Sequence, residues 1–305
     1  METTAPKRHL LPLAACAAML ASCGSDPAAA PVPASVPAAS AQPAPTRVVC
    51  LSCAAVDIFT ALGELDRVIA VEEDCPAPGT EGKLKIRNED HPGKLAAFNV
   101  ESVLALHPDA VIAQPDLKEA LSNRGLRVVW SPDHYSYDNI HVLPERIGEL
   151  LGMQDRVRTL LEHMRAKETQ IRGQTASLPK VTVYYETTGI GWTVGNQGVM
   201  NAMIELAGGL NIARDIAKAN TTITPEAIFA ADPEVIVLGA FADTVDEVKA
   251  RPGWDKLRAV RASRVYHIPI ERRNVAQGTP RCVDECESML LPWLHPELAA
   301  SATPR

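Results

Sequence analysis

Cysteines are the residues of this chain whose types and spacing are best suited to chemistry. After the first 45 residues the sequence contains Cys50, Cys53, Cys75, Cys282 and Cys286. Thiolates select copper(I), zinc or iron–sulfur clusters, whereas oxidising compartments favour disulfides. The last two cysteines stand four residues apart in a predicted helix, a spacing poorly suited to a bond between them. Three interpretations therefore compete. The cysteines could form at least one disulfide, they could be inert and buried, or Cys53, Cys75, Cys282 and Cys286 could bind a metal.

No motif for catalysis accompanies these cysteines. The sequence lacks Gly-x-Ser-x-Gly, His-Glu-x-x-His and a glycine-rich phosphate loop followed by Lys and Ser or Thr. The 8 histidines are scattered, and none pairs with another at metal-ligand spacing. We therefore expect a protein that is not an enzyme and requires no cofactor.

The beginning of the chain predicts export and membrane attachment. Residues 1–22 combine Lys7 and Arg8 with a short apolar run, a pattern typical of a signal peptide. They lead into Leu20-Ala21-Ser22-Cys23, which resembles the lipobox of bacterial lipoproteins. The resemblance implies that Cys23 is lipidated; a chance cysteine beside an ordinary cleavage site is the alternative. Residues 23–45, rich in Ala and Pro, predict an extended tether, and hence an anchored protein in the periplasm or on the outer cell surface.

The composition of the remaining chain indicates an α/β protein. Only 4% of residues are aromatic, while 46% are hydrophobic, mostly Ala, Val, Leu and Ile, as buried strands require. The formal charge of -7 argues against nucleic acid as a partner. Apart from the signal peptide, no apolar stretch predicts a membrane span.

Alternating helical and extended patterns divide this part of the chain into two lobes. Residues 46–138 and residues 175–305 each show βα units with short turns, which predicts mostly parallel sheets. Between them, residues 139–174 carry apolar side chains at three- and four-residue steps, the pattern of a long amphipathic helix. We expect this helix to connect the lobes, with Gly148 and Gly152 as its weak points.

An internal repeat relates the two lobes. Residues 99–112 align without a gap on residues 224–237. In both copies a capping residue opens a short helix, a glutamate (Glu101 or Glu226) takes its second position, and a proline-acid pair precedes a strand. A negative charge near the N-terminus stabilises a helix, and this effect alone would explain both glutamates. Two matched exposed glutamates would also suit a symmetric docking surface.

Several segments in this order resemble the iron-siderophore and cobalamin substrate-binding proteins of ABC importers, of the helical-backbone metal receptor superfamily. They are residues 47–52, 61–63, 66–71, 99–112, 204–212, 264–266 and 278–281. The resemblance implies two Rossmann-like α/β lobes joined by one long backbone helix, with a ligand cleft between the lobes. It also implies that Glu101 and Glu226 dock onto permease arginines.

The function that this resemblance implies is transport. We expect a lipid-anchored, monomeric receptor that captures a ferric siderophore, haem or cobalamin and delivers it to an ABC permease and its ATPase. The alternative is a cysteine-ligated metal-binding or iron–sulfur redox protein on the same two-lobe scaffold.

Loops at the carboxyl ends of the strands should line the cleft, since open α/β sheets bind ligands there. The candidates for ligand contact are Cys53, Cys75, Tyr185, Trp192, Arg272 and Arg273. The tryptophan stands among glycines and could stack on a planar chelate or simply pack. The two arginines could bind ligand carboxylates or be solvated surface charges.

The cysteines depart from the family pattern. In the family the first loop usually reads Ser-Leu-Ser-Pro-Ser, whereas Cys50 and Cys53 replace the first serine and the proline here. Cys75, Cys282 and Cys286 should lie near the same cleft mouth. We expect any bond or shared metal to join the first lobe to the final helix, so that a disulfide would close a loop of about 200 residues.

Overall fold

The computed structural model describes residues 43–301, apart from residues 74, 76, 88–97, 118–119, 122–123 and 133–135. The predicted signal peptide, the predicted lipidation site Cys23 and most of the predicted tether therefore lie outside the described residues. Among the described helices, none combines the length and the apolar character that crossing a membrane would need.

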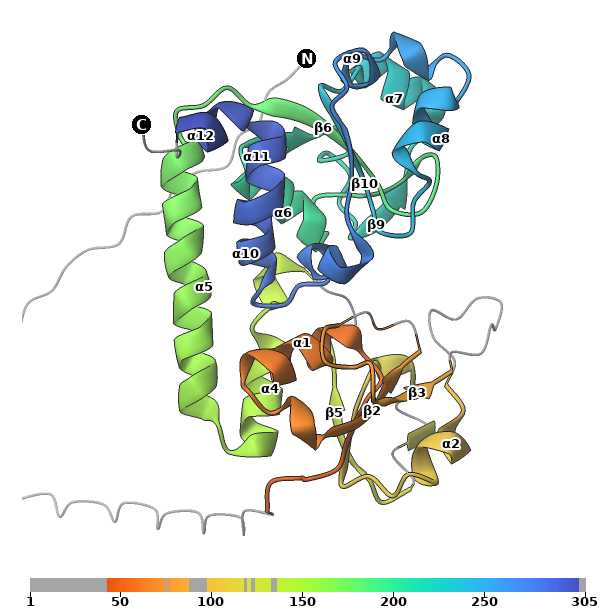
Figure 1. The fold of residues 1–305 in the computed structure, drawn as a ribbon, viewed down its shortest axis with the longest axis vertical. Helices are drawn as coiled ribbons and strands as arrows, with labels where there is room; N and C mark the ends of the chain where they lie inside the picture. Colours follow the sequence, from red (N-terminus) through yellow and green to blue (C-terminus); the bar gives the residue numbers. More distant parts are fainter. Residues whose placement is uncertain are drawn as a thin grey trace, which may run out of the picture. The chain divides into compact units, whose positions relative to one another are not determined.

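The first lobe is built on a parallel sheet with the strand order β3-β2-β1-β4-β5. All three side chains of β1 are fully buried, as expected for a central parallel strand that is covered on both faces. Helices α1 and α2 and the short turns η1 and η2 accompany the strands (Figure 1). The bounds are β1 Val48–Cys50, α1 Cys53–Ala61, η1 Leu65–Arg67, β2 Val68–Glu72, β3 Leu84–Ile86, α2 Val100–Leu104, β4 Ala110–Ala113, η2 Pro115–Leu117 and β5 Arg127–Trp130.

The connection between the lobes consists of two helices rather than one. After η3 (Tyr137–Asn139), α4 (Val142–Leu151) ends where Gly152 adopts a left-handed conformation with φ 69°. The chain turns there, and α5 (Gln154–Thr175) runs for 22 residues, about 33 Å, beside both lobes (Figure 1). The long backbone helix predicted from the sequence is thus present, but it begins about fifteen residues later than expected because glycine reverses the chain.

The second lobe repeats the parallel arrangement with the strand order β11-β10-β6-β8. A two-stranded antiparallel ribbon, β7 with β9, is added to it. The bounds are β6 Val181–Glu186, β7 Trp192–Val194, α6 Val199–Leu206, β8 Gly209–Asn211, β9 Asn220–Thr222, α7 Pro225–Ala231, β10 Val235–Leu238, α8 Val245–Ala250, η4 Trp254–Lys256, α9 Arg258–Arg261, β11 Val265–His267, η5 Ile270–Ala276, α10 Cys282–Glu285, η6 Cys286–Leu290, α11 Leu291–Leu294 and α12 Pro296–Ser301.

The internal repeat is confirmed as a structural repeat. Its two copies form α2 followed by β4 and α7 followed by β10. The side chains of Asn99 and Thr224 cap the two helices by accepting backbone hydrogen bonds. The equivalent residues His107 and Asp232 both have positive φ angles, 46° and 39°, and each lies three positions before its strand begins. The same local sequence thus makes the same helix-to-strand turn in each lobe.

The hydrophobic core continues from one lobe to the other. One cluster of buried side chains includes Val48 and Phe59 of the first lobe, Leu161 of α5, and Val183 and Leu290 of the second lobe. Burial of this shared apolar surface stabilises the lobes against each other as well as internally. The strand ends that meet between the lobes are therefore held by a common scaffold.

Candidate functional site

A cavity of about 590 Å³ is lined by residues of both lobes. The carboxyl ends of β1, β2, β4 and β5 contribute on one side, and β6, β7, α6, β9 and η5 contribute on the other. Its lining residues are Ser52, Cys53, Ala54, Glu72, Gln114, Ser131, Pro132, Tyr185, Thr187, Val194, Gly198, Val199, Met200, Ala219, Asn220, Phe241, Arg273, Ala276 and Gln277. Strand ends from two sheets thus converge where parallel α/β folds bind ligands.

A larger hollow of about 980 Å³ is a weaker candidate site. It lies beside β5 and α4, is lined only by residues of the first lobe and α4, and faces the outer edge of the sheet. The cavity between the lobes, hereafter called the cleft, has an apolar lining and polar groups from both lobes that point to a common space, which makes it the stronger candidate.

Three of the six predicted cleft residues line the cleft. They are Cys53, Tyr185 and Arg273. Tyr185 is 5% exposed, and burial raises the pKa of its hydroxyl, so it is a neutral group at physiological pH. Its neighbour Tyr184 lies on the other face of β6, in a separate core cluster with Trp254, as the alternation of a strand requires.

The other three predicted residues do not line the cleft. Cys75 is buried, and Arg272 forms an ion pair with Glu285 on its own lobe. Trp192 is 57% exposed at the start of the β7–β9 ribbon, outside the lining of the cleft. Stacking of Trp192 on a planar ligand therefore stays a prediction that would need movement of the ribbon or of the lobes.

A buried charge network holds the turn that carries Trp192. Arg251 of the α8 C-terminus donates to the carboxylate of Glu186, which is fully buried. The hydroxyl of Tyr184 donates to the same carboxylate and accepts the Gly191 N–H at 2.8 Å. Gly191 has φ 81°, and a Cβ there would stand 2.3 Å from the carbonyl oxygen of Ile223, so only glycine fits this turn.

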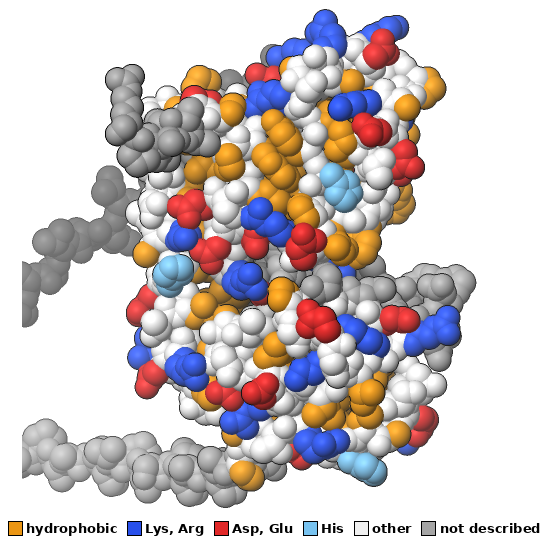
Figure 2. Space-filling view, viewed as in Figure 1, with side chains coloured by type: hydrophobic (Ala, Val, Ile, Leu, Met, Phe, Trp, Pro, Cys, Tyr) orange, Lys and Arg blue, Asp and Glu red, His pale blue; other side chains and the backbone are white. Residues whose placement is uncertain are grey.

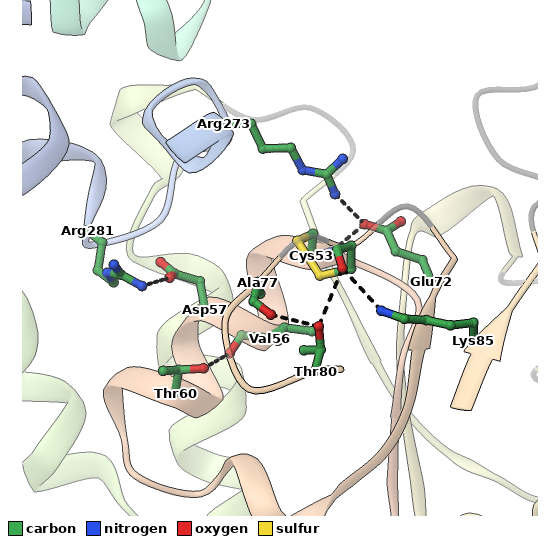
Figure 3. The surroundings of a disulfide bond; sticks show 11 residues. Cys53, Val56, Asp57, Thr60, Glu72, Ala77, Thr80, Lys85, Arg273 and Arg281 are labelled. Atoms are coloured by element: carbon green, nitrogen blue, oxygen red, sulfur yellow. Dashed lines mark hydrogen bonds and ion pairs between the residues drawn. A yellow bond between two sulfur atoms is a disulfide. The ribbon is translucent and has the colours of Figure 1, made fainter. Parts of the chain in front are cut away.

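Arg273 crosses the cleft to the opposite lobe. Its Nη2 lies 3.2 Å from Oε1 of Glu72, at the end of β2 (Figure 3). The same carboxylate oxygen accepts the N–H of Cys53 at 2.8 Å, so Glu72 also satisfies a donor in the first turn of α1. The guanidinium carbon lies 5.5 Å from the ring centroid of Phe241, another lining residue. The end of β2, the start of α1 and Arg273 of the second lobe thus meet at the carboxylate of Glu72.

A second ion pair joins the lobes nearby. Arg281 Nη1 lies 2.7 Å from Oδ1 of Asp57, whose side chain is almost fully buried on α1 (Figure 3). Sequence reasoning missed this residue. The only indication in the sequence is that Asp57 stands among the apolar residues of the first helix. A single sequence does not show which basic residue pairs with such an acid.

The cysteines are divided between two places. Cys53 and Cys75 form a disulfide with a sequence separation of 22 residues. The expectation that any bond would link the first lobe to the final helix was therefore wrong, because β1 and β2 are adjacent strands and bring both loops together. Cys50, Cys282 and Cys286 are free and buried.

The predicted four-cysteine metal set does not assemble among the described residues. Cys286 donates from its Sγ to the carbonyl oxygen of Met203 at 3.3 Å, within the second lobe. Burial raises the pKa of the thiols of Cys282 and Cys286, so both stay protonated near neutral pH. The described residues that could hold a metal together are Cys53, Glu72 and Cys75.

The two predicted docking glutamates are exposed. Glu101 forms a solvent-exposed ion pair with Arg124 at 3.1 Å. The pKa of Glu226 is lowered by hydrogen bonds from its own backbone N–H and from Thr224, so it supports its helix end as well. On the face drawn in Figure 2, basic and acidic side chains are interspersed, with no continuous basic patch. Docking stays a prediction for both residues.

Comparisons with known proteins agree with this geometry. The family model for periplasmic binding proteins matches residues 48–271. The chain belongs to this family. This periplasmic binding protein is 30% identical to a cobalamin-binding protein of Halobacterium salinarum over 260 residues, which cover 80% of this chain and 68% of the relative. It is 28% identical to the ABC transporter substrate-binding lipoprotein YvrC of Bacillus subtilis, over 80% of this chain and 79% of that protein.

A solved structure shares the fold of this periplasmic binding protein. It is the periplasmic haem-binding protein RhuT of Roseiflexus sp. RS-1, with a TM-score of 0.70 and 20% sequence identity, covering 81% of this chain and 97% of that one. At this identity the likeness shows the two-lobe fold alone. The predicted fold class and family are confirmed.

Proposed function

We propose that this periplasmic binding protein captures a metal chelate of the ferric siderophore, haem or cobalamin class in the cleft and passes it to the permease of an ABC importer. The observation that carries the proposal is the cleft itself, which both lobes line at the carboxyl ends of their strands. Its volume, about 590 Å³, falls within the range of roughly 300–1,000 Å³ typical of small-molecule sites.

The lining suits a broad ligand with apolar faces and polar edges. Tyr185, Met200 and Phe241 offer apolar surface from the second lobe, while Gln114 and Gln277 offer amide groups from opposite sides. A corrinoid, a porphyrin or a siderophore complex has this mixed character. The name of one relative, a cobalamin-binding protein, supports the same class of cargo.

Delivery and anchoring are part of the proposal. Glu101 and Glu226 occupy equivalent positions of the structural repeat, one on each lobe, and are exposed. Such a pair suits two matching arginines of a permease with two related subunits. Lipidation of Cys23 would leave the lobes on a tether of about 20 residues above the membrane, within reach of that permease.

Titration of the purified protein with a panel of chelates tests the proposal. The panel is cobalamin, haem and several ferric siderophores, and the readout is the change in intrinsic fluorescence together with calorimetry. We expect one chelate to bind at one equivalent with a dissociation constant in or below the micromolar range. If none binds at concentrations up to about a millimolar, the proposed cargo class is wrong.

A further inference from the structure

Three side chains of ligand type gather at the edge of the cleft. One sulfur from Cys53, one from Cys75 and a carboxylate oxygen of Glu72 all lie within 4.8 Å of one another. Figure 3 shows Cys53 and Glu72 beside the disulfide. Cys53 and Glu72 also line the cleft, and the Glu72 side chain is 18% exposed there, whereas both cysteines are buried. The transport of a chelate does not require such a group.

A helix and a strand position two members of this group, and a disulfide fixes the third. Cys53 is the first residue of α1 and Glu72 is the last residue of β2. Parallel pairing of Cys50 with Val71 brings the ends of β1 and β2 side by side. The Cα atoms of Cys53 and Cys75 are 5.3 Å apart, and Glu72 is fixed by the Cys53 N–H.

We propose that Cys53, Cys75 and Glu72 form a zinc-type cation site that is gated by the redox state of the two cysteines. Two thiolates and one carboxylate are a suitable donor set for Zn²⁺, which prefers four tetrahedral ligands and accepts sulfur and oxygen. The fourth position would face the cleft, where water or a group of the cargo can occupy it. Two sulfurs on one tetrahedral zinc stand about 3.8 Å apart, so opening the disulfide requires only a small movement.

The gate is a thiol–disulfide exchange. A thiolate of a dithiol reductant attacks one sulfur of the Cys53–Cys75 bond, and the second thiol of the reductant then releases the mixed disulfide. The cysteine pair gains two electrons and two protons, and the reductant leaves as a disulfide. Binding of Zn²⁺ displaces both thiol protons to solvent. In the oxidised protein Cys53 and Cys75 are bonded to each other, so neither can bind the metal as a thiolate and the site is absent.

The surrounding charges support both states. Cys53 stands at the N-terminus of the nine-residue helix α1, where the helix dipole stabilises a thiolate. With the metal bound, two thiolates, the Glu72 carboxylate and Zn²⁺ sum to one negative charge, which Arg273 at 3.2 Å balances. In the disulfide form, Glu72 and Arg273 balance each other. Since Arg273 belongs to the other lobe, occupancy of the site would also alter the contact between the lobes.

Cobalt titration of the full-length protein tests the site. Co²⁺ is a spectroscopic substitute for Zn²⁺, and thiolate ligation gives a sulfur-to-cobalt charge-transfer band. After reduction by a dithiol and removal of the reductant, we expect a band that saturates at one equivalent and disappears on addition of Zn²⁺. The oxidised protein should show none. Glu72→Gln should weaken binding at least tenfold, and Cys286→Ala should leave the band unchanged, as a matched control.

Two results would overturn the site. One is the absence of the band from the reduced protein at millimolar Co²⁺, and the other is its persistence in the double variant Cys53→Ser/Cys75→Ser. Should that variant fail to fold, alkylation of the unaltered protein decides the question. Zn²⁺ should protect Cys53 and Cys75 from iodoacetamide, and equal labelling with and without Zn²⁺ would refute the site. Neither readout involves a chelate, so failure here leaves the proposed cargo untouched.

Discussion

Arg273 and Glu72 are 201 residues apart in the sequence and form an ion pair from opposite lobes. Both side chains are mostly buried, 8% and 18% exposed, and both line the cleft. A ligand entering the cleft must therefore accommodate or replace this contact. The pair links the state of the cleft to the relative position of the lobes.

Loss of Arg273 should destabilise the fold. In Arg273→Met, Glu72 loses its guanidinium partner in a poorly solvated place, and we expect the free energy of unfolding to fall by roughly 3 kcal/mol. Urea denaturation followed by circular dichroism measures the change. Arg158→Met removes an ion pair in which both side chains are well exposed and should cost less than about 1 kcal/mol. Equal losses in the two variants would mean that the pair across the cleft contributes no more than a surface contact.

Two equivalent acids should contribute to the loss of stability at low pH. Asp109 accepts hydrogen bonds from Thr46 and Arg47 before β1, and Glu234 accepts them from Thr182 at the start of β6. Backbone hydrogen bonds are the largest cause of the lowered pKa of each carboxyl group. Because these pKa values are lower in the folded protein than in the unfolded chain, the stabilisation is complete above the unfolded pKa values, about 4, and is lost as the pH falls through the folded values.

Replacement of both acids tests this pH dependence. The double variant Asp109→Asn/Glu234→Gln should be less stable than the original protein at pH 7, and its stability should fall less steeply between about pH 5 and pH 2. Thermal unfolding across this range is the measurement, with the exposed Asp155→Asn as the control. Parallel pH curves for the double variant and the original protein would contradict the assignment.

Charge reversal tests the docking surface. Glu101→Lys/Glu226→Lys should abolish uptake of the chelate while leaving its affinity for the isolated protein nearly unchanged, since like charges would then face each other at the permease. The control is Glu81→Lys/Glu162→Lys, which reverses two other exposed acids. Normal uptake by the first pair of substitutions would return both glutamates to a role at their helix ends.

The anchor can be tested by fractionation. If Cys23 carries the lipid, the protein should sediment with membranes, and its mature N-terminal peptide should begin at Cys23 with the added mass of acyl chains. The variant Cys23→Ala should appear in the soluble fraction instead. Membrane association unchanged in that variant would rule out the predicted lipidation.

Local patterns in the sequence made the fold predictable, but they did not predict the contacts across the cleft. The buried strands β1, β4 and β10 are apolar runs, and the repeat shows a short helix and a turn before the strand in both lobes. Burial on both faces leaves such runs few alternatives. Gly152 was recognised as a weak point, but only its positive φ shows that the chain reverses there.

The cleft was predicted less well because it depends on which strand ends meet. The rule that ligands bind at the carboxyl ends of parallel strands selected Cys53 and Arg273, and the alternation of side chains along a strand allowed Tyr185; all three line the cleft. It could not reveal that Arg273 pairs with Glu72 or that Cys53 bonds to Cys75, since both depend on strand order and on the packing of the lobes. Trp192 was selected for its glycine neighbours, which instead form a tight turn.

Ligand titration of a cleft variant tests the central claim most directly. Phe241 is 57% exposed and lines the cleft, so Phe241→Ala should leave the fold intact and weaken chelate binding at least tenfold through lost apolar contact. Leu84→Ala, which removes a similarly exposed apolar side chain outside the cleft, should bind as the original protein does. Calorimetry measures the chelate affinity of the original protein, of these two variants, and of variants of Tyr185 and Gln277. Unchanged affinity in Phe241→Ala and in the variants of Tyr185 and Gln277 would show that the chelate does not bind in the cleft.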